Sequence, residues 1–171
     1  MNSTNNNNEA LLFDIETLLN VAQANKILWL SNSNPDSIES YRQQKSVIGQ
    51  KVNIDEFKPI DKDKLLTIDQ HYDMAIVYDF VEHLNKTEAI QILARLRDFL
   101  CPQFCVALTL DDENWQLTDL LALGLRKVSS YPNSNNELAL FKYSISNYKN
   151  VPDWLNADNW ANPKMWGKYW W

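Results

Sequence analysis

The stretch 73–110 constrains the fold most, because it predicts a strand, a loop, a helix and a second strand in that order. Residues 74–78 form a short apolar run, which is typical of a strand buried on both faces of a parallel sheet. Over 87–100 apolar residues recur at helical spacing, and Pro102 then ends the helix. A second apolar run follows over 104–110. Two such strands joined by a covering helix predict an α/β fold.

The length of 171 residues predicts one domain with a core large enough to need no disulfide or metal. No apolar run approaches the roughly 20 residues that a membrane-spanning helix requires. Residues 1–8 are polar and lack the basic and apolar regions of a secretory signal, so we expect a disordered lead-in and a cytoplasmic protein. The net charge of −6, without any Lys/Arg cluster, argues against binding to nucleic acid.

The two cysteines, Cys101 and Cys105, lie among apolar neighbours and are predicted to be buried thiols. A metal or redox pair would more often have two intervening residues and further ligands, and the chain offers only His71 and His83 besides. We therefore predict no metal site.

The first half of the chain begins with a predicted packing helix over 9–25 and a strand over 27–30. Pro35 then starts a second helix that runs to about Gln44. Residues 45–54 suggest a second, irregular strand around Gly49. The charged segment 61–64 indicates a surface turn before a short helix or strand over 65–68.

The last third predicts a helix and a hairpin. Leucines recur through 115–123, and Gly124 is placed as the C-cap. Two strands, 125–131 and 137–146, flank a polar turn-forming loop, so they must be antiparallel.

Four short segments have a characteristic composition: Tyr-Asp-Met-Ala-Ile-Val at 72–77, Val-Glu-His-Leu at 81–84, and the closing segments 123–128 and 138–141. With these segments and this order of elements, the chain resembles the class I S-adenosylmethionine-dependent methyltransferases over about 9–148. The resemblance implies a Rossmann-like fold with a mostly parallel sheet and an antiparallel C-terminal hairpin. The link between the second strand and Asp73 is too short for the family's third helix and strand, so we expect a reduced middle region.

The elements that bind the cofactor in this family are altered here. The family's glycine-rich loop after the first strand corresponds to Ser31, Asn32, Ser33 and Asn34, and glycine is what lets a backbone approach a ligand closely. The family's acidic residue at the end of the second strand, which holds the ribose hydroxyls, aligns with Asn53. We expect no cofactor, with S-adenosylmethionine binding through Ser31, Asn32, Ser33, Asn53 and Asp79 as the alternative.

His83, with Asp79 and Glu82, follows the third predicted strand, where open α/β sheets place their ligands. A histidine beside a carboxylate could act as a general base, so His83 and Asp79 are the candidate catalytic residues. The simpler interpretation is that this loop is tied to the next helix and has no catalytic role.

Residues 149–171 form a Trp-rich segment. Five of its last 21 residues are tryptophans, and the aromatic candidates for partner contact are Trp154, Trp160, Trp166, Tyr169, Trp170 and Trp171. Tryptophan is frequent at the centres of interfaces, so the segment docks on another protein or packs on its own domain. The amino-acid sequence of residues 160–170 is similar to the C-terminal sequence of a small uncharacterised proteobacterial family.

These observations predict a methyltransferase-like binding or scaffold protein that lacks catalysis and acts through its aromatic segment, with a homo-oligomer left open. The alternative is an active S-adenosylmethionine-dependent methyltransferase with an atypical cofactor loop.

Overall fold

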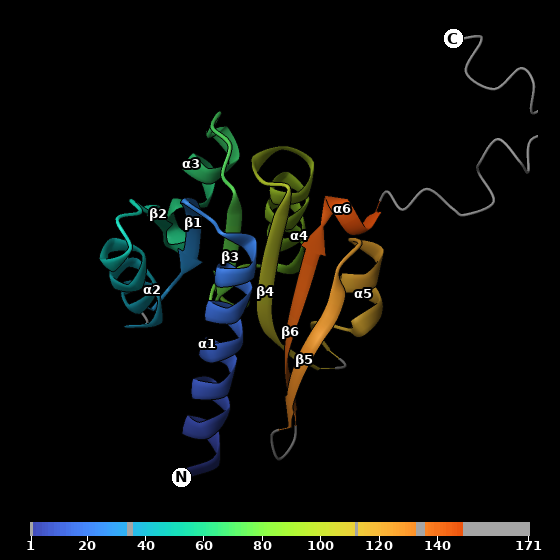
Figure 1. Cartoon of the computed structure of the whole chain (residues 1–171). Coiled ribbons are helices and arrows are strands. Elements are labelled where there is room, and N and C mark those ends of the chain that lie inside the picture. The colour runs from blue at the N-terminus through green and yellow to red at the C-terminus, as the bar shows by residue number, and fades with distance from the viewer. Residues whose placement is uncertain (1, 34–35, 112, 133–135, 149–171) are drawn as a thin grey trace, which may run out of the picture.

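The computed structural model describes residues 2–33, 36–111, 113–132 and 136–148, and in these the centre is a six-stranded sheet (Figure 1). Its spatial order is β2-β1-β3-β4-β6-β5. The strands are β1 Lys26–Ser31, β2 Asn53–Phe57, β3 Met74–Tyr78, β4 Gln103–Leu110, β5 Arg126–Pro132 and β6 Glu137–Ser144.

The sheet is mostly parallel. β1 pairs in parallel with both β2 and β3, and β3 pairs in parallel with β4. β6 is antiparallel to β4 and to β5, with a register shift between Lys127 and Ser129. The expected Rossmann-like sheet with an antiparallel C-terminal hairpin is confirmed.

Helices cover both faces of the sheet. They are α1 Asn2–Ala22, α2 Asp36–Val47, α3 Lys62–Thr67, α4 Lys86–Arg95, α5 Leu117–Ala122 and α6 Ile145–Tyr148, with 3-10 turns η1 Pro59–Asp61 and η2 Val81–His83 and a π-helical turn η3 Leu96–Leu100. Buried residues of α1 and α2 pack against one face, and those of α3, α4 and α5 against the other. The central strands β1, β3 and β4 are therefore buried on both sides, as their continuous apolar runs predicted.

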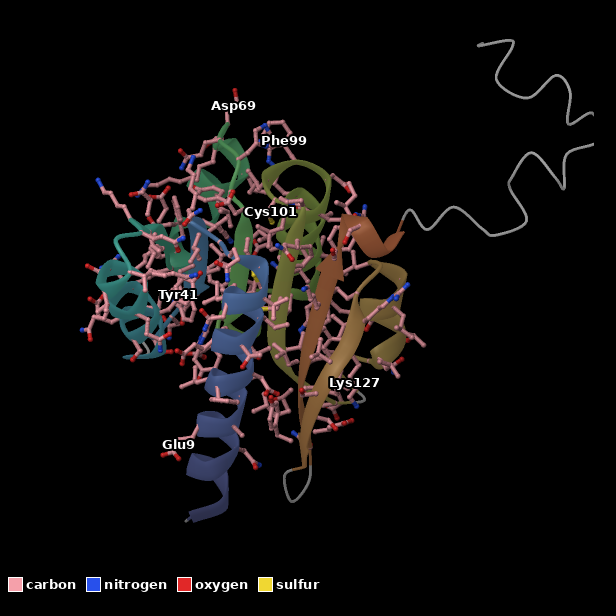
Figure 2. The ribbon with its side chains drawn as sticks, in the orientation of Figure 1. Glu9, Tyr41, Asp69, Phe99, Cys101 and Lys127 are labelled. Atoms are coloured by element: carbon pink, nitrogen blue, oxygen red, sulfur yellow. The ribbon has the colours of Figure 1, made fainter. Side chains whose placement is uncertain are left out.

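On the first face, α1 buries Leu11, Ile15 and Leu19 at helical spacing. The hydroxyl of Tyr41 in α2 donates to the carbonyl oxygens of Leu19 (3.3 Å) and Ala24 (3.0 Å), and Figure 2 shows this tyrosine between the two helices. The carbonyl of Leu19 is in the last turn of α1, where a helix leaves its acceptors unpaired, and that of Ala24 lies just after the helix.

On the second face, α4 begins as the sequence predicts. The side chain of Asn85 accepts the backbone N–H of Glu88 (2.9 Å), which is a helix N-cap, and Ala89, Ile92 and Leu93 are buried beneath it. Helical structure continues through η3 to Leu100, so the predicted end at Pro102 is confirmed.

Two parts of the first half differ from the elements expected there. In the structure residues 2–8 belong to α1, because a helix nucleated by its packed part extends at the gain of one hydrogen bond per residue. The irregular strand predicted for 45–54 is in fact the last turn of α2, a turn in which Gly49 has φ +75°, and the first residues of β2.

The middle of the chain is short, as expected. Between β2 and β3 the structure has only η1 and α3, and β2 pairs with β1 alone, so β2 and β5 are the two edge strands of the sheet in the described residues.

The start of β1 is fixed beside β3 by one carboxylate. Asp73 Oδ2 accepts the backbone N–H groups of Asn25 and Lys26, each at 2.8 Å. The backbone N–H of Asp73 in turn donates to the carbonyl of Lys26 (2.8 Å). This clamp sets the register at the amino end of the two strands that position the candidate site.

Candidate functional site

The loops that follow β1 and β3 meet at the carboxyl edge of the sheet. Ser31 and Tyr78 are paired at the ends of these strands, and the N–H of Asn32 donates to the carbonyl oxygen of Asp79 (2.9 Å). β1 leads to α2 on one face and β3 leads to α4 on the other. This divergence makes a topological switch point, where open α/β sheets bind their ligands.

The loop after β1 closes on itself through a serine side chain. Ser31 is only 3% exposed, and its Oγ accepts the backbone N–H of Ser33 (3.1 Å). The two hydroxyl oxygens lie 3.3 Å apart. The N–H of Ser33 is therefore already bound within the loop and is not directed to a ligand.

The loop after β3 contains a strained residue. Asp79 has φ +48°, a left-handed conformation that costs a non-glycine residue about 1 kcal/mol or more. Its Oδ1 lies 2.9 Å from Nε2 of His83 in η2, and both side chains are about two-fifths exposed. A contact so exposed adds little stability, so this pair leaves a histidine and a carboxylate available at the edge.

Acidic and phenolic groups surround that pair. Burial, reinforced by the Asp79 charge, raises the pKa of Glu82, although part of this residue stays exposed. Burial also raises the pKa of Tyr78, with smaller contributions from Asp79 and Glu82. A site of this character suits a neutral or cationic group better than an anion.

The prediction for Asn53 is wrong in its placement. Asn53 is the first residue of β2, where it pairs with Lys26, and its N–H donates to the carbonyl of Asn25 (2.7 Å). It lies at the amino edge, opposite Ser31 and Asp79. The cause is the longer α2, which ends at Val47 and moves the start of β2 along the chain.

The carboxyl end of β2 is Phe57, which pairs with Leu30 and is followed by Lys58. The acidic residue nearest this end is Glu56, which is exposed and pairs with Trp29. Because side chains alternate along a strand, Glu56 points to the same face as Ser31. Sequence reasoning missed it, and the turn signal at Gly49 could have indicated the later strand.

Other candidates have structural roles. Cys101 and Cys105 are buried, as predicted, and burial raises the pKa of each thiol to about 12. The carboxylate of Asp111 accepts hydrogen bonds from Asn114 and, with a smaller effect, from the N–H of Glu113, and these bonds hold its pKa below the usual range. Among the described residues, His, Cys, Asp and Glu form no cluster able to hold a metal ion.

The Trp-rich segment lies outside the described residues, so its role in partner contact stays a prediction. Within the described part of the chain, every helix is too short or too polar to cross a bilayer.

A family of unknown function, DUF6231, matches residues 9–171, which include the Trp-rich segment. The chain belongs to this family. The expected resemblance to an uncharacterised family is confirmed, and membership in DUF6231 assigns no activity. Among curated proteins, none matches this DUF6231 chain in sequence.

Solved structures resemble the DUF6231 chain in fold. Magnesium protoporphyrin IX methyltransferase from Synechocystis, with S-adenosylmethionine bound, is 9% identical with a TM-score of 0.52, covering 82% of this chain and 80% of its own. A 1,6-didemethyltoxoflavin-N1-methyltransferase from Burkholderia thailandensis, with S-adenosylhomocysteine, is 13% identical with a TM-score of 0.52, covering 80% and 79%. WbdD is 12% identical with a TM-score of 0.56, covering 81% of this chain and 41% of WbdD. The likenesses to the two methyltransferases show a class I methyltransferase-like fold.

Proposed function

We propose that this protein is a methyltransferase-like binding protein that does not transfer methyl groups and that contacts another protein through its Trp-rich segment. The observation that carries the first half is the closed loop after β1. The hydroxyl oxygen of the buried Ser31 accepts the backbone N–H of Ser33, so that N–H cannot bind a ligand. Residues 31–34 also contain no glycine, which would allow a nucleoside to approach the backbone closely.

Isothermal titration with S-adenosylmethionine and S-adenosylhomocysteine tests this half of the proposal. We expect no saturable heat with either compound, and micromolar binding would contradict the proposal. The matched variant carries Ser31→Gly and Ser33→Gly together, which removes both hydroxyls. If crowding by these side chains is what closes the site, this variant binds either compound more tightly than the wild type does.

The second half rests on composition. Five tryptophans within 21 residues carry far more aromatic surface than a segment of this length leaves in water, and two aspartates balance two lysines there. A chain ending at Asn150 tests the role of this segment. We expect it to stay folded by circular dichroism and to lose a partner that the full chain retains in a pull-down. Aggregation of the shortened chain would instead show that the segment completes the core.

A second candidate function is favoured by the His83 and Asp79 pair at the switch point. In an active methyltransferase, the methyl group would pass from the sulfonium of S-adenosylmethionine to an acceptor whose proton His83 takes, leaving S-adenosylhomocysteine. Transfer of a labelled methyl group to a cell extract, abolished by His83→Ala, would support this function and overturn the first. Absence of transfer leaves the binding function.

A further inference from the structure

Exposed apolar side chains lie on α5 and α6, the helices next to the end of the described chain. Leu117 and Leu121 on α5 are 42% and 50% exposed, and Ile145 on α6 is 43% exposed. Leu117 and Leu121 are four residues apart and so share one side of α5, while Leu120 between them is fully buried. We name these three side chains the α5–α6 patch.

The elements that carry the patch converge. Gly124, just after α5, has a backbone that would place a Cβ atom 3.5 Å from Cε2 of Tyr143. Tyr143 is in β6, two residues before Ile145, and Arg126 at the start of β5 pairs with Lys142 of β6. Figure 1 shows α6 beside the end of α5. The chain therefore leaves its last described residue, Tyr148, next to the patch.

The Trp-rich segment, which follows Tyr148, would lower its free energy by packing on an apolar surface. A tryptophan side chain buries about 150 to 250 Å² when it packs, and the segment holds five of them. Because the patch lies close to Tyr148, docking of the segment there closes only a short loop, and little chain entropy is lost. Both considerations identify the segment as the natural occupant of the patch.

We propose that the α5–α6 patch is the docking surface of the chain's own Trp-rich segment in the partner-free protein. This inference deepens the proposed function and rests on its second half. Tryptophans seated on the patch hold the segment in one place, so the remaining aromatic side chains are presented to a partner without a further ordering cost.

A second exposed apolar surface makes the proposal specific. On α1, Phe13 is 69% and Val21 is 72% exposed, and both line a groove between α1 and α2. This groove lies on the opposite face of the sheet, since α1 and α5 belong to different core layers. To reach it, the segment would have to pass around the sheet, so we expect the groove to stay uncovered by it.

Paramagnetic broadening in the full-length protein tests the proposal. A nitroxide label is attached to Leu121→Cys or, as the matched control on α1, to Val21→Cys. Labelling is selective because the two native thiols are buried and their pKa values are raised to about 12. The readout is the set of indole N–H signals, two from Trp29 and Trp115 in the domain and five from the segment.

With the label at residue 121 we expect Trp115, two residues before α5, and most of the segment's indole signals to lose intensity, and Trp29 to keep it. With the label at residue 21 the segment's signals should stay intact. Intact segment signals with the label at 121, or loss with the label at 21, would overturn the proposal.

A mixed sample separates docking within one chain from contact between copies. Labelled protein without isotope is mixed with isotope-labelled protein without nitroxide, and broadening in this mixture would assign the patch to a second copy and overturn the proposal. A shift of the Trp29 and Trp115 signals in either cysteine variant would indicate a perturbed fold. In that case the label is attached to Trp160→Cys, and the backbone N–H signals of Leu121 and Val21 are compared. Only the signal of Leu121 is expected to broaden. Partner contact is measured separately, by the pull-down that compares the full chain with the chain ending at Asn150, so the two proposals can fail separately.

Discussion

Replacing Asp73 with alanine removes the clamp that fixes β1 beside β3. One carboxylate oxygen accepts two backbone N–H groups at 2.8 Å, and both strands lead to the switch point. Each hydrogen bond to a charged acceptor contributes about 1.5 to 3 kcal/mol when buried, and exposure to water lowers this contribution, so we expect Asp73→Ala to reduce the free energy of unfolding by about 2 to 3 kcal/mol. In a domain of this size that loss lowers Tm by roughly 4 to 12 °C.

Two variants separate geometry from charge. Asp73→Asn keeps an amide oxygen that accepts both N–H groups, so only the charge assistance is lost, and the reduction should be about 1 kcal/mol. Asp69→Ala removes the same charge from the exposed turn before β3, which Figure 2 shows at the end of the molecule, and it should change stability by less than about 0.5 kcal/mol.

Urea unfolding followed by circular dichroism measures all three variants against the wild type. The reasoning is refuted if Asp73→Ala is no less stable than Asp69→Ala, because the two bonds would then contribute nothing. Equal losses for Asp73→Ala and Asp73→Asn would show that the charge, and not the pair of hydrogen bonds, holds the strands.

The remaining predictions concern the core. Leu19→Ala should cost about 2 to 4 kcal/mol in urea unfolding because Leu19 is 1% exposed, whereas the matched change Val21→Ala on the exposed side of α1 should cost less than about 0.5 kcal/mol. Equal losses would show that α1 is not packed as described. Burial raises the pKa values of Cys101 and Cys105 to about 12, so the unfolded chain loses these protons first as the pH rises. Stability should be unaffected by these thiols below about pH 8 and should fall by up to about 1.4 kcal/mol per pH unit for each thiol above pH 9. A variant with alanine at both positions should lose this slope between pH 9 and 10, and an unchanged slope would contradict the assignment.

The sequence predicts the regular part of this fold well because apolar periodicity there agrees with the final packing. β3 has the predicted bounds of 74–78, α4 and β4 follow in order, and Gly124 takes the positive φ expected of its place after a helix. These elements have regular apolar patterns with clear stops, so local propensity and burial favour the same structure.

The segment 45–57 shows why the rest could not be predicted. Val47 and Ile48 are apolar yet 87% and 65% exposed. Their apolar character therefore predicts a buried strand at a place where the structure has none. The actual strand, β2, contains Asp55 and Glu56 because an edge strand is not buried on both sides. The error shifted the second strand and with it the placement of Asn53, whereas Asn32 and Asp79, which follow well-predicted strands, lie side by side in the structure.

A sheet that stops at β2 leaves one row of backbone donors and acceptors with no neighbouring strand among the described residues. In many proteins the strands of other molecules can pair with such an exposed edge, and repeated pairing produces fibres. Here a second copy of β2 that paired with this edge would place its own acidic residues opposite Asp55 and Glu56. The resulting charge repulsion disfavours edge-to-edge association through β2 at high protein concentration.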